Sequence, residues 1–295
     1  MRSSGKLADV SRILRQSGIP DAEKEALTLI TETLGITADV FFRDNPHISD
    51  GLLREIDART ARRARGEPLQ YIAGHVDFLG LRIHVGPGVL IPRPETELLV
   101  METISELKKK RSVRDEPDGS MTSALRLRIL DLCTGSGCIA VALARAFPAS
   151  DVYGIDRSPA ALRYATANAA SNRTDNVHFL LGDLYEPLGP ERFDCITANP
   201  PYIRTEDMQK LQREIRHFEP PEALDGGADG LVFFRRLVAG APGRLRENGM
   251  LVMEVGYGQA AEVQEIALGA GFALTEVRED YAGIPRIFVG FAGEI

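Results

Sequence analysis

The sequence lacks the long apolar runs that membrane insertion or secretion requires. No uninterrupted apolar stretch in its 295 residues approaches the length needed to cross a bilayer. The opening residues, Met1 to Lys6, also lack the apolar core of a secretion signal. We therefore expect a cytoplasmic protein that is long enough for one large domain or two modest ones.

Cysteine and histidine are too sparse for a disulfide framework or a metal centre. The three cysteines, Cys133, Cys138 and Cys195, fit neither a paired framework nor the spacing of metal ligands, and the five histidines form no cluster. Packed thiols in reduced surroundings are the simplest interpretation. We predict no metal site.

Positive charge is also in short supply. The net charge of -7 argues mildly against a nucleic-acid binder, because such proteins need positive surface to displace phosphate counterions. One short stretch departs from this balance and holds Arg54, Arg59, Arg62, Arg63 and Arg65. These arginines indicate either the solvated face of a helix or a surface that docks a partner.

The first 92 residues predict a helical domain and a linker. Residues 1–70 have apolar residues at helical spacing, with breaks near Pro20, Gly35 and Pro46. Residues 71–92 alternate in polarity on both sides of Gly80, which predicts a β-hairpin linker. We expect a helix from Pro94 to Leu107 and then a mobile, charged surface loop over residues 108–123.

Residues 93–295 are predicted to form an α/β domain, because strands and helices alternate from Leu125 onward. A mainly parallel, Rossmann-like sheet is typical of such a succession. The predicted strands are 128–132, 151–155, 177–181, 193–198, 250–255, 272–277 and 286–290, and the predicted helices between them are 137–147 and 159–172.

A glycine-rich turn follows the first of these strands. Its glycines allow a tight bend and the close approach of a ligand, at the edge of the sheet where ligands bind. Taken alone, the turn is also compatible with an NAD enzyme or with a purely structural role. It consists of Cys133, Thr134, Gly135, Ser136 and Gly137.

Acidic residues end the next two strands. Asp156 stands where a carboxylate can accept hydrogen bonds from both ribose hydroxyls of an adenosyl group, although a plain helix N-cap is the alternative. Asp183 could accept from an adenine amino group while Leu184 packs on the ring. No phosphate-binding G-x-G-x-x-G motif is present, which favours S-adenosylmethionine over a dinucleotide.

The fourth strand runs directly into Asn199, Pro200, Pro201 and Tyr202. The side-chain oxygen of Asn199 and the carbonyl of Pro200 can each accept one hydrogen of a planar –NH2 group, and Tyr202 offers an aromatic face for stacking. An amide nitrogen held in this way can face a sulfonium methyl, and its transfer then depends on positioning rather than on a strong general base. A merely rigid loop is the alternative.

Four segments resemble motifs of known families. Residues 131–137 resemble motif I of class I methyltransferases, and residues 199–202 resemble the (D/N/S)PP(Y/F) motif of amino methyltransferases. Residues 91–97 and 218–231 are similar to the blocks that flank the catalytic motifs in the HemK/PrmC family. Together with the helical N-terminal domain, the resemblance covers essentially the whole chain.

The resemblance implies a class I methyltransferase fold with a small all-helical N-terminal domain and a β-hairpin linker. It implies methylation of N5 of the glutamine in the Gly-Gly-Gln motif of class 1 peptide chain release factors. By position, Cys133 to Gly137, Asp156 and Leu184 would bind S-adenosylmethionine, and Asn199 to Tyr202 would hold the glutamine carboxamide.

The chain departs from the HemK/PrmC pattern in two places. Many members have glycine where this chain has Cys133, and we expect the change to cost little if the backbone there avoids positive φ. The charged insert over residues 108–120 has no assigned role.

Two rival functions use the same residues. An N6-adenine nucleic-acid methyltransferase would present the same planar –NH2 group, but it must flip its base and hold a phosphate backbone, which the acidic chain disfavours. A non-enzymatic scaffold is disfavoured by the presence of Gly135 and Asn199. We therefore predict an enzyme that releases S-adenosylhomocysteine, places Asn199 beside both cofactor and acceptor, and uses residues 1–70 to recognise a release factor rather than a nucleic acid or a membrane.

Overall fold

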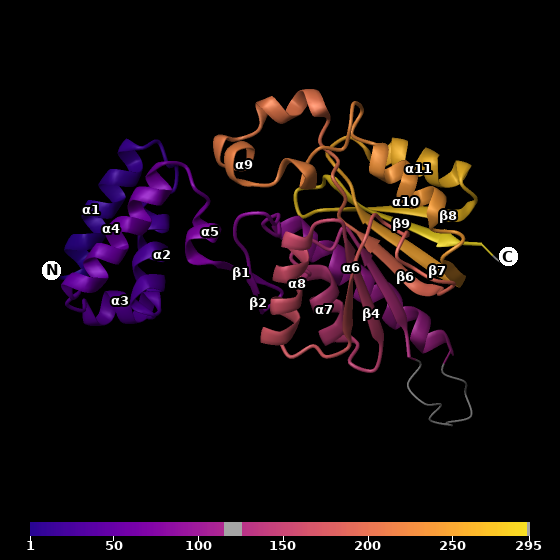
Figure 1. Cartoon of the computed structure of the whole chain (residues 1–295), viewed down its shortest axis with the longest axis horizontal. Helices are drawn as coiled ribbons and strands as arrows, with labels where there is room; N and C mark the ends of the chain where they lie inside the picture. The colour runs from indigo at the N-terminus through magenta and orange to yellow at the C-terminus, as the bar shows by residue number, and fades with distance from the viewer. Residues whose placement is uncertain (115–125, 294–295) are drawn as a thin grey trace. The chain divides into compact units, whose positions relative to one another are not determined.

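The computed structural model describes residues 1–114 and 126–293, and the chain divides into two compact units (Figure 1). The helical unit consists of residues 1–75 together with residues 212–218, and the α/β unit consists of residues 76–211 and 219–295. Across the described residues, every helix is too short or too polar to cross a membrane.

The helical unit contains the helices predicted for the N-terminal region. Gly35 ends one of them with a φ of 64°, in the left-handed region that glycine enters without strain. Thr37 begins the next by accepting a hydrogen bond from the backbone N–H of Val40. The helices are α1 (Ser3–Gln16), α2 (Ala22–Leu34), α3 (Ala38–Asp44), α4 (Asp50–Ala64) and α5 (Leu69–Ala73), joined by α9 (Arg213–Phe218) from later in the chain.

A single apolar cluster holds α1 to α5 together. Except for Ile48, which lies between α3 and α4, its buried members come from the amphipathic helices, as the helical spacing in the sequence predicts. The largest of these buried side chains are Leu14, Leu29, Ile30, Phe41, Ile48 and Ile56.

The arginine cluster of α4 contains one internal member. Arg63 is only 4% exposed, and it donates to both carboxylate oxygens of Glu25, at 2.5 and 3.1 Å. Its Nη1 also lies 3.0 Å from a carboxylate oxygen of Glu214 in α9. Arg63 therefore links α2, α4 and α9, so it belongs neither to a solvated helix face nor to a docking surface.

We expect Arg63→Met to lower the free energy of unfolding by about 3 kcal/mol, because it leaves the mostly buried Glu25 without its partner. Arg65 is exposed, and the described part of the chain gives it no ion pair, so Arg65→Met is a matched control that should change stability by less than about 0.5 kcal/mol. Urea denaturation followed by circular dichroism measures both. Equal stabilities of the two variants would show that the buried ion pair contributes little.

A seven-stranded sheet forms the centre of the α/β unit, in the order β5-β4-β3-β6-β7-β9-β8. The first five strands in this order run parallel, and β9 pairs antiparallel with both β7 and β8. The mainly parallel sheet predicted from the sequence is therefore confirmed. The strands are β3 (Arg128–Leu132), β4 (Asp151–Asp156), β5 (Val177–Leu181), β6 (Phe193–Ala198), β7 (Leu245–Glu254), β8 (Phe272–Glu279) and β9 (Pro285–Ala292).

Two groups of helices cover the sheet. One group is α6 (Pro94–Arg114), α7 (Cys138–Ala146) and α8 (Pro159–Ser171), and the other is α10 (Val232–Gly240) and α11 (Ala260–Gly269). Right-handed crossovers lead from β3 toward β5 on one side and from β6 toward β7 on the other, which places the two groups on opposite faces. Successive strands are added on one side of β3 up to β5 and then on its other side from β6 onward, so the carboxyl ends of β3 and β6 form a topological switch point of the kind where ligands bind.

The charged insert is partly helical, contrary to the loop expected from residue 108. Helix α6 continues to Arg114, and on it Lys109 pairs with Glu106 at 2.8 Å. Lysine and arginine are good helix formers and are favourable near a helix C-terminus, so the charge run extends the helix instead of ending it. Residues 115–123 of the expected loop lie outside the described residues.

The predicted β-hairpin is present and belongs to the α/β unit from Val76 onward. Its strands are β1 (His75–Phe78) and β2 (Leu81–His84). Asn168 of α8 accepts from the backbone N–H of His84 at 2.7 Å and donates to the carbonyls of His84 and Ser136 at 3.0 and 2.9 Å. One buried side chain thereby fastens the hairpin to the glycine-rich turn after β3.

Candidate functional site

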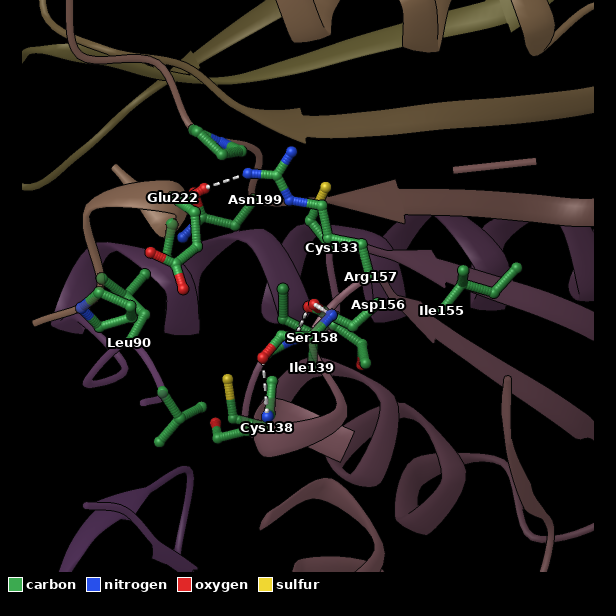
Figure 2. A pocket seen from close by; sticks show the side chains of 18 of the residues that line it. Leu90, Cys133, Cys138, Ile139, Ile155, Asp156, Arg157, Ser158, Asn199 and Glu222 are labelled. Atoms are coloured by element: carbon green, nitrogen blue, oxygen red, sulfur yellow. Dashed lines mark hydrogen bonds between the residues drawn. The ribbon is translucent and has the colours of Figure 1, made fainter. Parts of the chain in front are cut away.

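A cavity of about 870 Å³, open to solvent, lies at the carboxyl ends of β3, β4 and β6 (Figure 2). Its position is the switch point of the sheet, where ligands bind in folds of this kind. Of the twelve residues proposed from the sequence, the three that do not line the cavity are Gly137, Pro200 and Tyr202. The nine that line it are Cys133, Thr134, Gly135, Ser136, Asp156, Asp183, Leu184, Asn199 and Pro201.

The glycine-rich turn leads from β3 into α7. A Cβ on Gly135 would meet no atom closer than 3.9 Å, so this backbone is open to a ligand. Gly137 has a φ of 76°, and a Cβ there would lie 2.9 Å from the Cβ of Ala165 in α8. The first glycine therefore exposes backbone to the cavity, and the second allows α7 and α8 to pack closely.

Cys133 adopts a left-handed backbone conformation, with a φ of 57°. The condition on which the change from glycine would cost little is therefore not met, because the chain turns sharply between β3 and Thr134. A side chain in this region costs roughly 1–2 kcal/mol relative to glycine. Burial raises the pKa of the Cys133 thiol, so the sulfur lies in the cavity wall as a neutral packing group rather than as a nucleophile.

Asp156 joins the end of β4 to the glycine-rich turn. Its Oδ2 accepts from the backbone N–H of Gly135 at 2.9 Å, and its Oδ1 accepts from that of Ser158 at 2.8 Å. Ser158, and not Asp156, caps α8, by accepting from the N–H of Ala161. Burial raises the pKa of Asp156, and the two backbone donors oppose this shift. The same two hydrogen bonds hold the carboxylate against the glycine-rich turn (Figure 2).

Asp131 is a buried acid that the sequence prediction did not single out. It lies in β3 without solvent exposure and accepts from the hydroxyls of Thr134 at 2.5 Å and Thr197 at 2.9 Å. Burial raises the pKa of Asp131 to about 7, against the effect of both hydroxyls. Its carboxyl group thus connects the turn after β3 with β6, below the cavity.

The shifted pKa of Asp131 predicts a dependence of stability on pH. The folded chain keeps this proton at pH values where the unfolded chain has lost it, so this carboxyl group costs increasing stability as pH rises from 3.8 to about 7. We expect the stability of wild type relative to Asp131→Asn to fall across this window and to level off above it. Thermal unfolding of both proteins across the pH series measures the difference, and parallel curves would contradict the shift.

The far wall of the cavity combines an ion pair with an aromatic ring. Asp183 accepts from Arg236 at 2.7 Å, and Leu184, at a φ of 52°, is buried against the core. Phe233, which the sequence prediction missed, lines the cavity with the guanidinium groups of Arg157 and Arg236 above its ring. Arg157 also donates to the carbonyl of Glu222 at 3.3 Å, as Figure 2 shows. Asp183 is therefore paired already, and the apolar surface comes from Leu184 and Phe233.

Asn199 lies at the cavity wall where β6 ends, and its Nδ2 donates to the hydroxyl of Thr96 at 3.1 Å. Tyr202 is not among the residues that line the cavity; its hydroxyl donates to Glu254 at 3.2 Å, and burial raises its pKa. Gln259 donates to the carbonyl of Tyr202 at 3.0 Å. Glu254 and Gln259 thus hold the side chain and the backbone carbonyl of Tyr202, which fixes the path of the chain after Asn199.

The two segments that resemble flanking blocks meet beside the cavity. Glu219, which is 3% exposed, accepts from the backbone N–H of Ile91 at 3.1 Å and from Arg93 at 2.5 Å. Pro92 and Pro220, their neighbours in sequence, both line the cavity. No local pattern predicts this pairing, because the partners lie more than 120 residues apart.

The sheet order, the turn after β3 and the cavity at the switch point define a class I methyltransferase. One family model, described as a methyltransferase domain, matches residues 125–223, and another, described as the PrmC N-terminal domain, matches residues 6–74. Relatives named release factor glutamine methyltransferase are 39% and 44% identical over 98% and 90% of the chain, so the chain belongs to that family.

Curated relatives match nearly the whole chain. The release factor glutamine methyltransferase of Thermodesulfovibrio yellowstonii is 44% identical over 90% of this chain and 91% of its own length. That of Geobacter sulfurreducens is 39% identical over 98% of this chain and 96% of its own length. Among solved structures, a methyltransferase from Pyrococcus furiosus covers 80% of this chain and 99% of its own with a TM-score of 0.53; at 18% identity, it shows the fold alone.

Proposed function

We propose that this chain transfers a methyl group from S-adenosylmethionine to N5 of the glutamine in the Gly-Gly-Gln motif of class 1 peptide chain release factors. The observation that carries the proposal is the position of Asn199, at the wall of the cavity and at the end of β6. Relatives that match nearly the whole chain are named for the same reaction, which supports the substrate class.

The cavity fits S-adenosylmethionine by the groups that it offers. Each oxygen of Asp156 accepts one backbone hydrogen bond and keeps a second lone pair for a ribose hydroxyl. Leu184 and Phe233 offer apolar surface to an adenine ring, and the turn around Gly135 leaves its backbone open. When bound, the cofactor supplies an electrophilic methyl group on a sulfonium sulfur and leaves as S-adenosylhomocysteine.

The acceptor amide is held by oxygens at the end of β6. The side-chain oxygen of Asn199 and the carbonyl of Pro200 each accept one hydrogen of the glutamine –NH2, while Pro201 forms part of the wall. Tyr202 does not line the cavity, and its hydroxyl is fixed by Glu254; the aromatic face that it would offer to the flat carboxamide belongs to the proposal. The nitrogen becomes acidic only as the methyl group arrives, so these residues orient it and no strong base is required.

The helical unit, with residues 1–70, recognises the release factor, and the hairpin over residues 71–92 leads into the catalytic domain. Of the arginine cluster, the exposed Arg54 and Arg65 are the candidates for docking, because Arg63 is buried in its ion pairs. The acidic total charge supports a protein partner over a nucleic acid.

Intact-mass analysis of a release factor incubated with the enzyme and S-adenosylmethionine tests the proposal. We expect the mass of one added methyl group, mapped to the glutamine of the Gly-Gly-Gln motif, and no addition to a variant with alanine at that position. Duplex and single-stranded DNA are included as competing acceptors. Methylation of adenine in DNA without methylation of the release factor would overturn the proposal.

A further inference from the structure

A chain of buried hydrogen bonds extends behind Asn199. Its Nδ2 donates to Thr96 Oγ1 at 3.1 Å, and Thr96 Oγ1 donates to Glu254 Oε2 at 2.6 Å. The other oxygen of Glu254 accepts from the hydroxyl of Tyr202 at 3.2 Å. Thr96 is 2% exposed and Glu254 1% exposed, so no bulk water competes for these bonds.

The direction of this chain follows from the chemistry of its end group. An ionised carboxylate only accepts hydrogen bonds, so the single hydroxyl proton of Thr96 must point to Glu254. The oxygen of Thr96 can then only accept from its other neighbour, and Asn199 must present its –NH2 side to Thr96. The carbonyl oxygen of Asn199 is consequently left for the acceptor.

We propose that Glu254 and Thr96 are positioning residues that select one of the two orientations of the Asn199 amide, the one that turns Oδ1 toward the acceptor nitrogen. The inference rests on the proposed function, because only an acceptor with –NH2 hydrogens requires that orientation. In the reverse orientation the –NH2 group of Asn199 would face the –NH2 group of the acceptor. Neither can accept a hydrogen bond from the other, so the acceptor amide would not be held for methyl transfer.

The groups around Glu254 define when it is ionised. Burial raises its pKa, and Glu95 of α6 adds to this shift, whereas the hydroxyls of Thr96 and Tyr202 and the guanidinium of Arg286 in β9 oppose it. A protonated Glu254 could donate to Thr96 and would permit the reverse orientation of the Asn199 amide. In wild type, kcat should therefore fall on the acid side, through a carboxyl group that titrates above its ordinary range.

The test compares Thr96→Val with Thr96→Ser in the full-length enzyme, with a release factor as methyl acceptor. Valine keeps the shape but removes the hydroxyl, and we expect kcat to fall about 10-fold, as is typical for the loss of one orienting hydrogen bond. The Kd for S-adenosylhomocysteine should change less than about twofold, and serine should restore kcat. Thr103→Val is the matched control, because Thr103 lies in the same helix and is fully buried, and among the described residues its hydroxyl bonds only to the carbonyl of Leu99.

Glu254→Gln removes the negative charge of this side chain but keeps its shape, so it tests whether the charge is needed to orient Asn199. The carboxamide can donate to Thr96 at every pH, so we expect a lower kcat without the acid limb of the wild-type profile. A kcat of Thr96→Val equal to that of Thr103→Val, or an unchanged acid limb in Glu254→Gln, would overturn the inference.

A second measurement does not depend on the methyl acceptor. The side-chain amide signals of Asn199 are assigned by their loss in Asn199→Asp. The proton that is bonded to Thr96 should exchange slowly with solvent in wild type and Thr103→Val, and rapidly in Thr96→Val. If the release factor is not methylated by wild type, the proposed function fails while this exchange still decides the positioning by Thr96. Fast exchange in wild type would contradict the hydrogen-bond chain itself.

Discussion

Replacing Asn199 with alanine is expected to lower kcat for methyl transfer by roughly 10²- to 10³-fold, the range seen when one preorganised hydrogen-bonding group is removed from an active site. The affinity for S-adenosylhomocysteine should change little, because the bond from Asn199 to the acceptor nitrogen acts mainly in the transition state. Radiolabelled methyl transfer to the release factor measures kcat, and calorimetry measures the affinity.

Asn199→Asp is the informative companion variant. It keeps an acceptor oxygen at the same place, so it should retain more activity than Asn199→Ala even though it loses the donor to Thr96. A large loss of cofactor affinity with normal turnover in Asn199→Ala would instead place Asn199 in cofactor binding, and the acceptor role would have to be abandoned.

The parts of the site that could be predicted from the sequence are the residues at the carboxyl end of an individual strand. The glycines stand in the turn just after β3, Asp156 is the last residue of β4, and Asn199 follows β6 directly. Parallel strands of one sheet bring such ends to one edge, so local sequence was sufficient to group these residues. Gly135, Asp156 and Asn199 line one cavity, whereas Gly137 does not, and the individual roles of all four stay predictions.

Glu254 is also an acidic residue at the end of an apolar strand, but the sequence prediction did not select it. It ends the apolar strand β7 as Asp156 ends β4, but no recognisable motif follows it. Thr96 gave no signal of its own, because its partners Asn199 and Glu254 lie 103 and 158 residues away. Contacts of this kind depend on the packing of α6 against the sheet, which local patterns do not encode.

Two errors arose from applying local rules without their tertiary context. Cys133 in place of glycine was expected to cost little provided that its backbone avoids positive φ, yet the turn into α7 imposes a φ of 57° there. Arg63 was grouped with exposed arginines because it lies in a charged stretch, yet Glu25 and Glu214 neutralise it inside the helical unit. In both cases the surrounding structure overrides the preference of the single residue.

Replacing Asp156 with alanine is expected to weaken the binding of S-adenosylhomocysteine by about 100-fold or more. Two hydrogen bonds from ribose hydroxyls to an ionised carboxylate are worth about 1.5–3 kcal/mol each, and losing both exceeds the ~2.7 kcal/mol that corresponds to a factor of 100. Calorimetric titration of the full chain measures the change. Affinity within about threefold of wild type would show that the cofactor does not contact this carboxylate.

Asp156 also accepts from the N–H groups of Gly135 and Ser158, so its loss could act through the turn alone. Asn168→Ala separates the two causes, because Asn168 bonds to the carbonyl of Ser136 in the same turn but does not line the cavity. If Asp156 contacts the ribose, Asp156→Ala should lose far more affinity than Asn168→Ala. Equal losses in the two variants would mean that the carboxylate only shapes the turn, and the ribose hydroxyls would need another acceptor.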